Sequence, residues 1–172
     1  MGNEENKIFN KSGSRFRASG REALKENVAL AFESARRAIA IYSPHLDPTQ
    51  FNQSRVIDAL ATFCAGGRHN KVRILVDHGD ETIRNNGRLT GLARQFSDFI
   101  DLRQLGEGIS APVDMFVVID RDSYLHQPDN QKAECIVDFS ASHEVSAFAK
   151  RFEQLWERSE PIAGLHVLGL GR

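Results

Sequence analysis

The composition excludes several classes of protein before any motif is considered. Two cysteines, Cys64 and Cys135, occur among 172 residues, so the chain has no disulfide framework. Both lie in apolar patterns, where free cysteine packs as a small hydrophobe, and we expect both in the core. The charge is nearly balanced, because 22 Lys and Arg face 23 Asp and Glu for a net charge of -1. No overall field attracts a polyanion, so the composition does not support nucleic-acid binding.

Long apolar runs are also missing. No segment approaches the ~20 apolar residues of a membrane span, and the amino terminus lacks the apolar stretch of a signal peptide. We therefore expect a cytoplasmic protein with no membrane partner. Five basic residues occur between positions 7 and 21 without an acidic one (Lys7, Lys11, Arg15, Arg17 and Arg21). We expect residues 1–18 to form a flexible basic arm, in preference to one that binds phosphate. Residues 19–172 then form a single domain.

Helices and strands alternate along most of the chain. Ser19 and Glu22 match a capping box, which predicts a first helix to about Arg37. Apolar periodicity predicts further helices through 56–63, 89–96 and 142–161, with a helical turn at Asp47 and Pro48. Strands are expected at 38–43, 72–76, 99–105, 115–120, 124–126 and 133–139. This order predicts an α/β fold, with helices flanking a mixed β-sheet that is parallel in its first part and antiparallel in its second.

Three segments resemble parts of a phospholipase D-like domain: 39–44, 113–120 and 138–142. In that superfamily the second segment carries the pattern His-x-Lys-x-x-x-x-Asp. Here Val113 stands in place of the histidine and Met115 in place of the lysine, and Asp120 alone is kept. The chain is also similar to a group of uncharacterised bacterial phospholipase D-like domains, some of which are joined to GNAT-type acetyltransferases. The resemblance implies a single phospholipase D-like domain.

The departures from the pattern decide the expected function. Phosphodiesterases of this kind need an imidazole to attack phosphorus and a cation to hold the phosphoryl oxygens. Val113 and Met115 can do neither, and we expect them to be ordinary core residues. We therefore expect a degenerate, non-catalytic domain that acts as a binding, regulatory or structural module. No catalytic residue, metal or cofactor is assigned.

Polar residues that follow the strands form a candidate binding cleft for a phosphate-containing small ligand. They are Ser43, His45, Asp77, His78, Asp120, Ser140 and Ser142. Ser140 and Ser142 precede the last helix, where they cap it and where free N–H groups can hold an anion. Asp77, His78 and Asp80 could bind a divalent metal, but a loop leading into a helix explains the same residues.

Two other functions stay open at this stage. The first is a divergent phosphodiesterase or nuclease in which His45 and His78 converge near Asp120. The second is an accessory subunit of an acyltransferase, which only the domain fusions of the similar proteins suggest. The resemblance also implies a homodimer, because phospholipase D-like proteins usually bring two such domains together and this chain holds one.

Overall fold

The computed structural model describes residues 15–139 and 143–165 of the chain. The elements in chain order are β1 (Arg15–Ser19), α1 (Arg21–Ser34), β2 (Ala38–Tyr42), α2 (Pro48–Phe51), α3 (Ser54–Ala65), β3 (Lys71–Val76), α4 (Gly79–Asn85), α5 (Gly87–Gln95), β4 (Ile100–Leu105), β5 (Met115–Ile119), β6 (Ser123–Gln127), β7 (Glu134–Asp138), α6 (His143–Trp156) and β8 (Ser159–Pro161).

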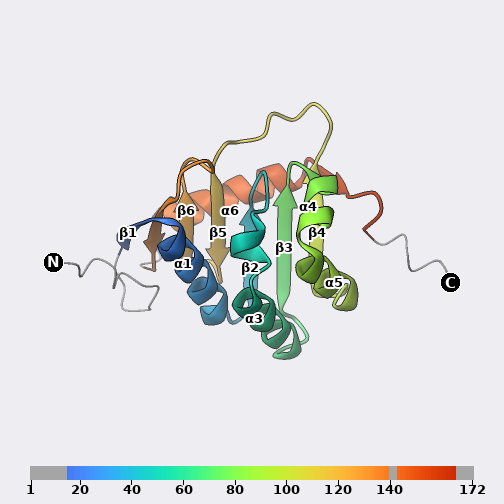
Figure 1. The fold of residues 1–172 in the computed structure, drawn as a ribbon, viewed down its shortest axis with the longest axis horizontal. Helices are drawn as coiled ribbons and strands as arrows, with labels where there is room; N and C mark the ends of the chain where they lie inside the picture. Colours follow the sequence, from blue (N-terminus) through green and yellow to red (C-terminus); the bar gives the residue numbers. More distant parts are fainter. Residues whose placement is uncertain (1–14, 140–142, 166–172) are drawn as a thin grey trace.

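All the described strands belong to one sheet, in the order β1-β7-β6-β5-β2-β3-β4-β8 (Figure 1). Strands β2, β3 and β4 are parallel to one another, and the remaining pairings are antiparallel. The predicted α/β fold with a mixed sheet is therefore confirmed. Because β5 runs against β2, the start of β5 lies at the same edge of the sheet as the ends of β2 and β3. We call this edge the carboxyl edge.

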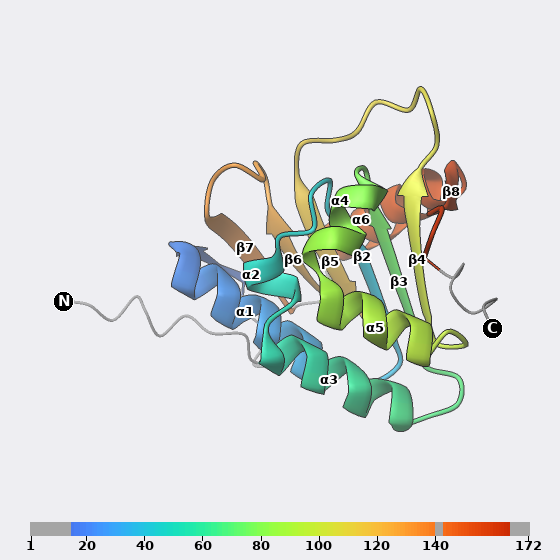
Figure 2. The same ribbon diagram turned by 45° about the vertical axis from the view of Figure 1, so that its right-hand side comes forward.

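The helices form layers on both faces of the sheet. Helices α1 to α5 cover one face and α6 lies alone across the other (Figure 2). The alternation of β2 shows why, because Ile41 belongs to the core under α1 to α5 and Tyr42 to the core under α6. Cys64 and Cys135 are both buried in the first core, as the sequence predicts.

The start of the chain differs from the expectation. Ser19 is the last residue of β1, and α1 begins after Gly20, whose φ of 101° suits glycine and which makes no side-chain cap. The predicted capping box is therefore wrong. Residues 15–18 of the expected basic arm lie in β1, which pairs with β7. The rest of that arm lies outside the described residues.

The last helix is shorter than predicted. It ends at Trp156, and Ser159–Pro161 instead forms β8, which pairs with β4 at the edge of the sheet. Proline suits an edge strand, where a missing N–H removes no ladder hydrogen bond. None of the helices in the described ranges combines the length and apolar character that crossing a bilayer requires.

Candidate functional site

His45 and His78 meet at the carboxyl edge. They follow the neighbouring parallel strands β2 and β3, and the backbone N–H groups of Asp77 and His78 both donate to the carbonyl of Pro44. This contact brings the two imidazoles into a stack, with ring centroids 4.3 Å apart and planes 16° from parallel. The two histidines therefore meet, which is one part of the geometry that the alternative of a divergent phosphodiesterase requires.

Each histidine lies beside a carboxylate. The Nδ1 atom of His45 lies 3.3 Å from Glu81, and the Nε2 atom of His78 lies 3.3 Å from Asp77. All four side chains are well exposed to water. Asp80 and Arg84 line the same shallow pocket as His78, so carboxylates outnumber the guanidinium there. In the part of the chain that the structure describes, no group of three ligating side chains is placed to hold a metal ion.

Asp120 does not join these histidines. It follows β5, which is antiparallel to β2, and so lies at the opposite edge of the sheet. Its carboxylate accepts hydrogen bonds from the backbone N–H groups of Arg36, Arg37 and Ala38, at 2.9, 2.7 and 2.9 Å. The placement of Asp120 in one cleft with His45 and His78 is therefore corrected, because its carboxylate instead fixes the turn between α1 and β2.

At the start of β5, positions 113 and 115 carry neither the imidazole nor the ammonium of the phospholipase D pattern. Val113 is 66% exposed, so the expectation of a core residue is wrong for it, while Met115 is buried as expected. Val113 precedes the strand, and its carbonyl accepts hydrogen bonds from the backbone and side-chain N–H groups of Asn130. These bonds fix the backbone and leave the side chain in solvent.

Asp114 lies between Val113 and Met115 and is nearly buried. Its carboxylate accepts two hydrogen bonds from Arg151 of α6, at 2.7 and 2.8 Å, and pairs with the Nε2 atom of His126 at 2.8 Å. Burial opposes ionisation of Asp114, but the hydrogen bonds from His126 and Arg151 outweigh it and hold its pKa well below the ordinary value. The only guanidinium bound at the start of β5 in the described chain is thus committed to a structural ion pair.

The sequence carries a signal for only part of the cluster of Asp114, His126 and Arg151. The short turn at 120–122 fixes the hairpin register that places Phe116 opposite His126, and Asp114 then lies diagonally on the same face. Arg151 gives no such local signal, because the crossing of α6 is decided by tertiary packing.

Of the remaining residues of the predicted cleft, one lies beside His45 and two lie outside the described residues. Ser43 is buried, donates its N–H to Leu75 and lines a small pocket with His45. Ser140 and Ser142 lie outside the described residues. Phe139, just before them, is nearly buried and packs on Phe16 with ring centroids 6.1 Å apart.

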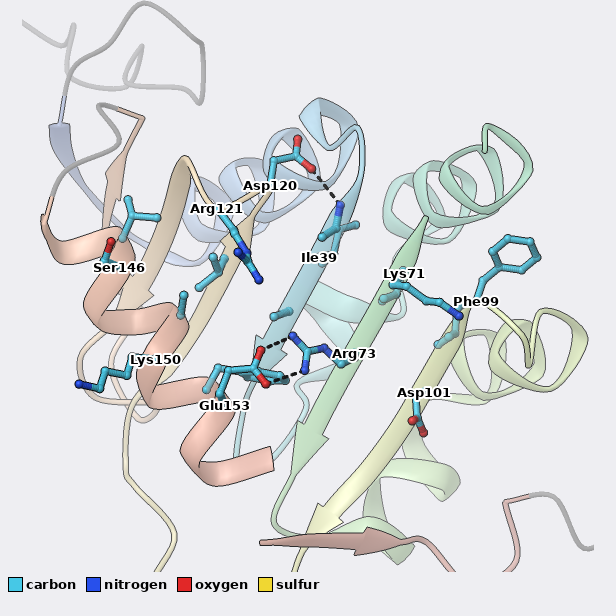
Figure 3. Close-up of a pocket in the computed structure, with 18 of the residues that line it drawn as sticks. Ile39, Lys71, Arg73, Phe99, Asp101, Asp120, Arg121, Ser146, Lys150 and Glu153 are labelled. Carbon is cyan, nitrogen blue, oxygen red and sulfur yellow. Dashed lines mark hydrogen bonds and ion pairs between the residues drawn. The ribbon is translucent and has the colours of Figure 1, made fainter. Parts of the chain in front are cut away.

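A larger cavity lies away from this edge. It has a volume of about 780 Å³ and lies between α6 and the sheet, near the starts of β2, β3 and β4 (Figure 3). Arg73 and Glu153 form an ion pair across it, with N–O distances of 2.9 and 2.5 Å. The cavity shares no residue with the His45 and His78 pockets.

Comparison with known proteins agrees with the fold. The family model described as "Domain of unknown function (DUF7931)" matches residues 20–168. No curated protein matches the sequence. Among solved structures, TrmBL2, an archaeal chromatin protein whose structure shows a novel mode of DNA binding, is similar with a TM-score of 0.63 at 13% identity. The similarity covers 90% of this chain and 56% of that one.

Phosphatidylserine synthase from Haemophilus influenzae Rd KW20, which has a phospholipase D-like fold, is similar with a TM-score of 0.59 at 14% identity. That similarity covers 86% of this chain and 39% of the synthase. At such identities the likeness shows the fold alone. It supports the phospholipase D-like resemblance at the level of the fold, with this chain spanning little more than half of the one protein and less than half of the other.

Proposed function

Because the chain belongs to the DUF7931 family and has a fold similar to that of phosphatidylserine synthase, we propose that it is a binding module that does not hydrolyse phosphodiesters. One observation carries the proposal. At the start of β5, an exposed valine and a buried methionine flank a carboxylate that Arg151 and His126 already bind. A nucleophile and a free cation are both needed for phosphoryl transfer of this kind. Val113 and Met115 supply neither, and the His126 imidazole and the Arg151 guanidinium are both bound to Asp114.

The pair formed by His45 and His78 does not replace the histidine and lysine of the phospholipase D pattern. A phosphodiester is an anion, and the pair lies beside the carboxylates of Asp77 and Glu81, which repel one. Asp120, the third residue of a rerouted mechanism, is at the other edge of the sheet. The acidic surroundings therefore disfavour a divergent nuclease or phosphodiesterase at this edge.

An accessory subunit of an acyltransferase is favoured by no observation. A docking subunit of that kind presents a broad apolar patch. Among the residues that the structure describes, Val113 alone is an exposed large hydrophobic side chain. Binding of DNA, described for TrmBL2, is not proposed for this chain, because its net charge of -1 provides no field for a polyanion.

A phosphodiesterase assay tests the proposal. We expect the purified protein to release no p-nitrophenol from bis(p-nitrophenyl) phosphate above the rate of a His45→Ala, His78→Ala double variant. Both positions are exposed, so the double variant is expected to keep its fold, which circular dichroism checks. Turnover by the wild type that disappears in a folded double variant would overturn the proposal.

A further inference from the structure

The cavity under α6 has the form of a ligand site. Its volume of about 780 Å³ falls within the roughly 300–1,000 Å³ common for small-molecule pockets. Small side chains leave the space open, because Ala38 and Ala40 of β2 face Ala149 of α6 across it. Alanine is a weak strand former, so its repeated use on this face of β2 is not explained by the sheet itself.

One unpaired cation, Arg121, points into this space. Figure 3 shows its side chain extending from the turn after β5 toward the ion pair of Arg73 and Glu153. Within the described ranges, no carboxylate lies within ion-pair distance of its guanidinium. The nearby Glu153 carboxylate binds Arg73, and its pKa is lowered first by that hydrogen bond and also by the charge of Arg121. The Asp120 carboxylate turns away to the backbone of residues 36–38.

The charged residues that line the cavity are balanced in number, with Lys71, Arg73, Arg121 and Lys150 against Asp98, Asp101, Asp120 and Glu153. The ammonium of Lys71 donates to the carbonyl of Asp98, and Lys150 stands exposed on α6 at the rim (Figure 3). Asp101 lies on β4, on the side of the cavity away from Arg121. Beside α6 the cavity is lined by Arg121, by Lys150 and by the ion pair of Arg73 and Glu153, and Ser146 adds a hydroxyl donor there.

The backbone at Arg121 is an independent observation. Asp120 and Arg121 both have positive φ values, 55° and 65°. Hairpin turns of this kind favour Asn or Asp followed by Gly, and Asp120 fits the first place. At the second place a side chain is strained where glycine would not be, and such strain tends to persist where the side chain has a role. The side chain of Arg121 is exposed, so it is not held there by core packing.

From the cavity, the unpaired guanidinium and its strained backbone, we infer that the space under α6 binds a small organic anion, a carboxylate or phosphate monoester with an apolar body. The anion pairs with Arg121, whose planar fork matches such a group with two hydrogen bonds. The apolar body lies over Ala40 and Val118. The inference rests on the proposed function only in that the domain acts by binding, since the cavity is separate from the carboxyl edge.

Matched probes test this site by calorimetric titration. Octanoate and octyl phosphate carry the anion, and octylamine has the same chain with a cation. We expect saturable binding of at least one anion, with octylamine at least about tenfold weaker. The preferred anion identifies the head group as carboxylate or phosphate. If neither anion binds, or if octylamine binds as well as the anions do, the inference is wrong.

Variants locate the binding and separate it from folding. Arg121→Gly is expected to weaken the anion by at least about tenfold while its Tm is no lower than that of the wild type, because glycine relieves the strain. Ala40→Leu fills the floor and is expected to weaken the same probe, whereas Thr62→Ala, exposed on α3 on the other face of the sheet, leaves it unchanged. Unaltered affinity in Arg121→Gly would overturn the inference. If phosphodiester turnover depends on His78 while anion binding still depends on Arg121, the proposed absence of hydrolysis is wrong and the anion site stands.

Discussion

Both oxygens of the Asp114 carboxylate are bound by the guanidinium of Arg151, at 2.7 and 2.8 Å, so that one ion pair fastens α6 to the start of β5. Arg151 also lies over the ring of Phe116, 4.8 Å from its centroid. The pair is nearly buried on the side of Asp114 and about one third exposed on the side of Arg151. Removing one partner therefore leaves a desolvated charge, which is more harmful than removing both.

The pH dependence of stability follows from this pair. The pKa of Asp114 is lower in the folded protein than in the unfolded chain, so the stabilisation is complete above the unfolded value of about 4 and is lost as the pH falls below it. We expect the urea midpoint to drop in this acid range, and to drop less steeply in Asp114→Asn. Some fall of the urea midpoint with pH should persist in Asp114→Asn, because Arg73 also lowers the pKa of Glu153. Asp101→Asn, at an exposed carboxylate, is the control, and an equal slope in Asp114→Asn and the wild type would contradict the assignment.

Asp120 is expected to be a structural residue. Its carboxylate accepts three backbone N–H groups that have no other acceptor, so Asp120→Ala should lower the free energy of unfolding by about 1–3 kcal/mol. Asp122→Ala, in the same turn, removes only a bond to the neighbouring Ser123 and is expected to cost less than about 0.5 kcal/mol. Denaturant unfolding measures both. Equal effects would show that the three hydrogen bonds do not set the stability of this turn.

Two glycines should respond in opposite directions to alanine. A Cβ at Gly79 would lie 2.2 Å from Oε1 of Gln104 and 2.9 Å from Ile162, so Gly79→Ala is expected to destabilise by about 1–3 kcal/mol. Gly91 lies inside α5 with open space around it, and Gly91→Ala should stabilise by about 0.5–1 kcal/mol. Thermal unfolding compares the two variants. A gain in Tm for Gly79→Ala would mean that the Gln104 side chain and Ile162 move aside freely.

Neither cysteine should act as a reactive thiol. Burial raises the pKa of Cys64 to about 11 and that of Cys135 to about 12, so almost no thiolate forms near neutral pH. We expect no reaction with 5,5′-dithiobis(2-nitrobenzoate) in the native protein and two thiols per chain after unfolding in guanidinium. A thiol that reacts rapidly in the native state would contradict the buried positions.

A two-fold dimer is a prediction that comes from the resemblance. Val113 is the exposed large apolar side chain of the described residues, so it is the residue at which we test the contact. Light scattering at micromolar concentration is expected to give a dimer mass for the wild type and for the control Thr62→Asp on α3, but a monomer for Val113→Asp. A monomeric wild type that stays monomeric on concentration would exclude the dimer.

The sequence predicted those parts of the fold in which local pattern and burial agree. Apolar periodicity found α3 and α5, and Asp47 caps α2 through the N–H of Thr49 as its position before Pro48 suggests. The predictions were wrong where a contact between residues far apart in the sequence determines the local structure. Ser19 reads as a helix cap from its neighbours, yet strand pairing with Glu134 takes it into β1. The early end of α1 depends on Asp120, more than 80 residues away.

The residues of the candidate site were likewise predicted where a local rule applies and missed where distant contacts determine their positions. His45 and His78 come together because parallel neighbouring strands bring their following loops to one edge, which is a rule that a strand order supplies. Val113 was expected in the core because the residues after it form a buried strand, but it lies two residues before that strand begins. The cavity at Arg121 left no pattern in the sequence, because its walls come from β2, β3, β5 and α6 at once.

The position of β2 has a consequence for the chain while it is being made. On one side β2 pairs with β3, so Ile41 can pair with Ile74 soon after both are synthesised. On the other side β2 pairs with β5, so Ile41 can pair with Val117 only after the later segment is synthesised. Until residues 115–119 leave the ribosome, β2 presents an unpaired row of N–H and C=O groups beside a buried-type apolar face. Such an edge can pair with other chains, and the delay grows with the sequence separation of the two strands. Recovery of soluble protein should therefore depend on how fast translation reaches β5 and on chaperones that cover β2 until then.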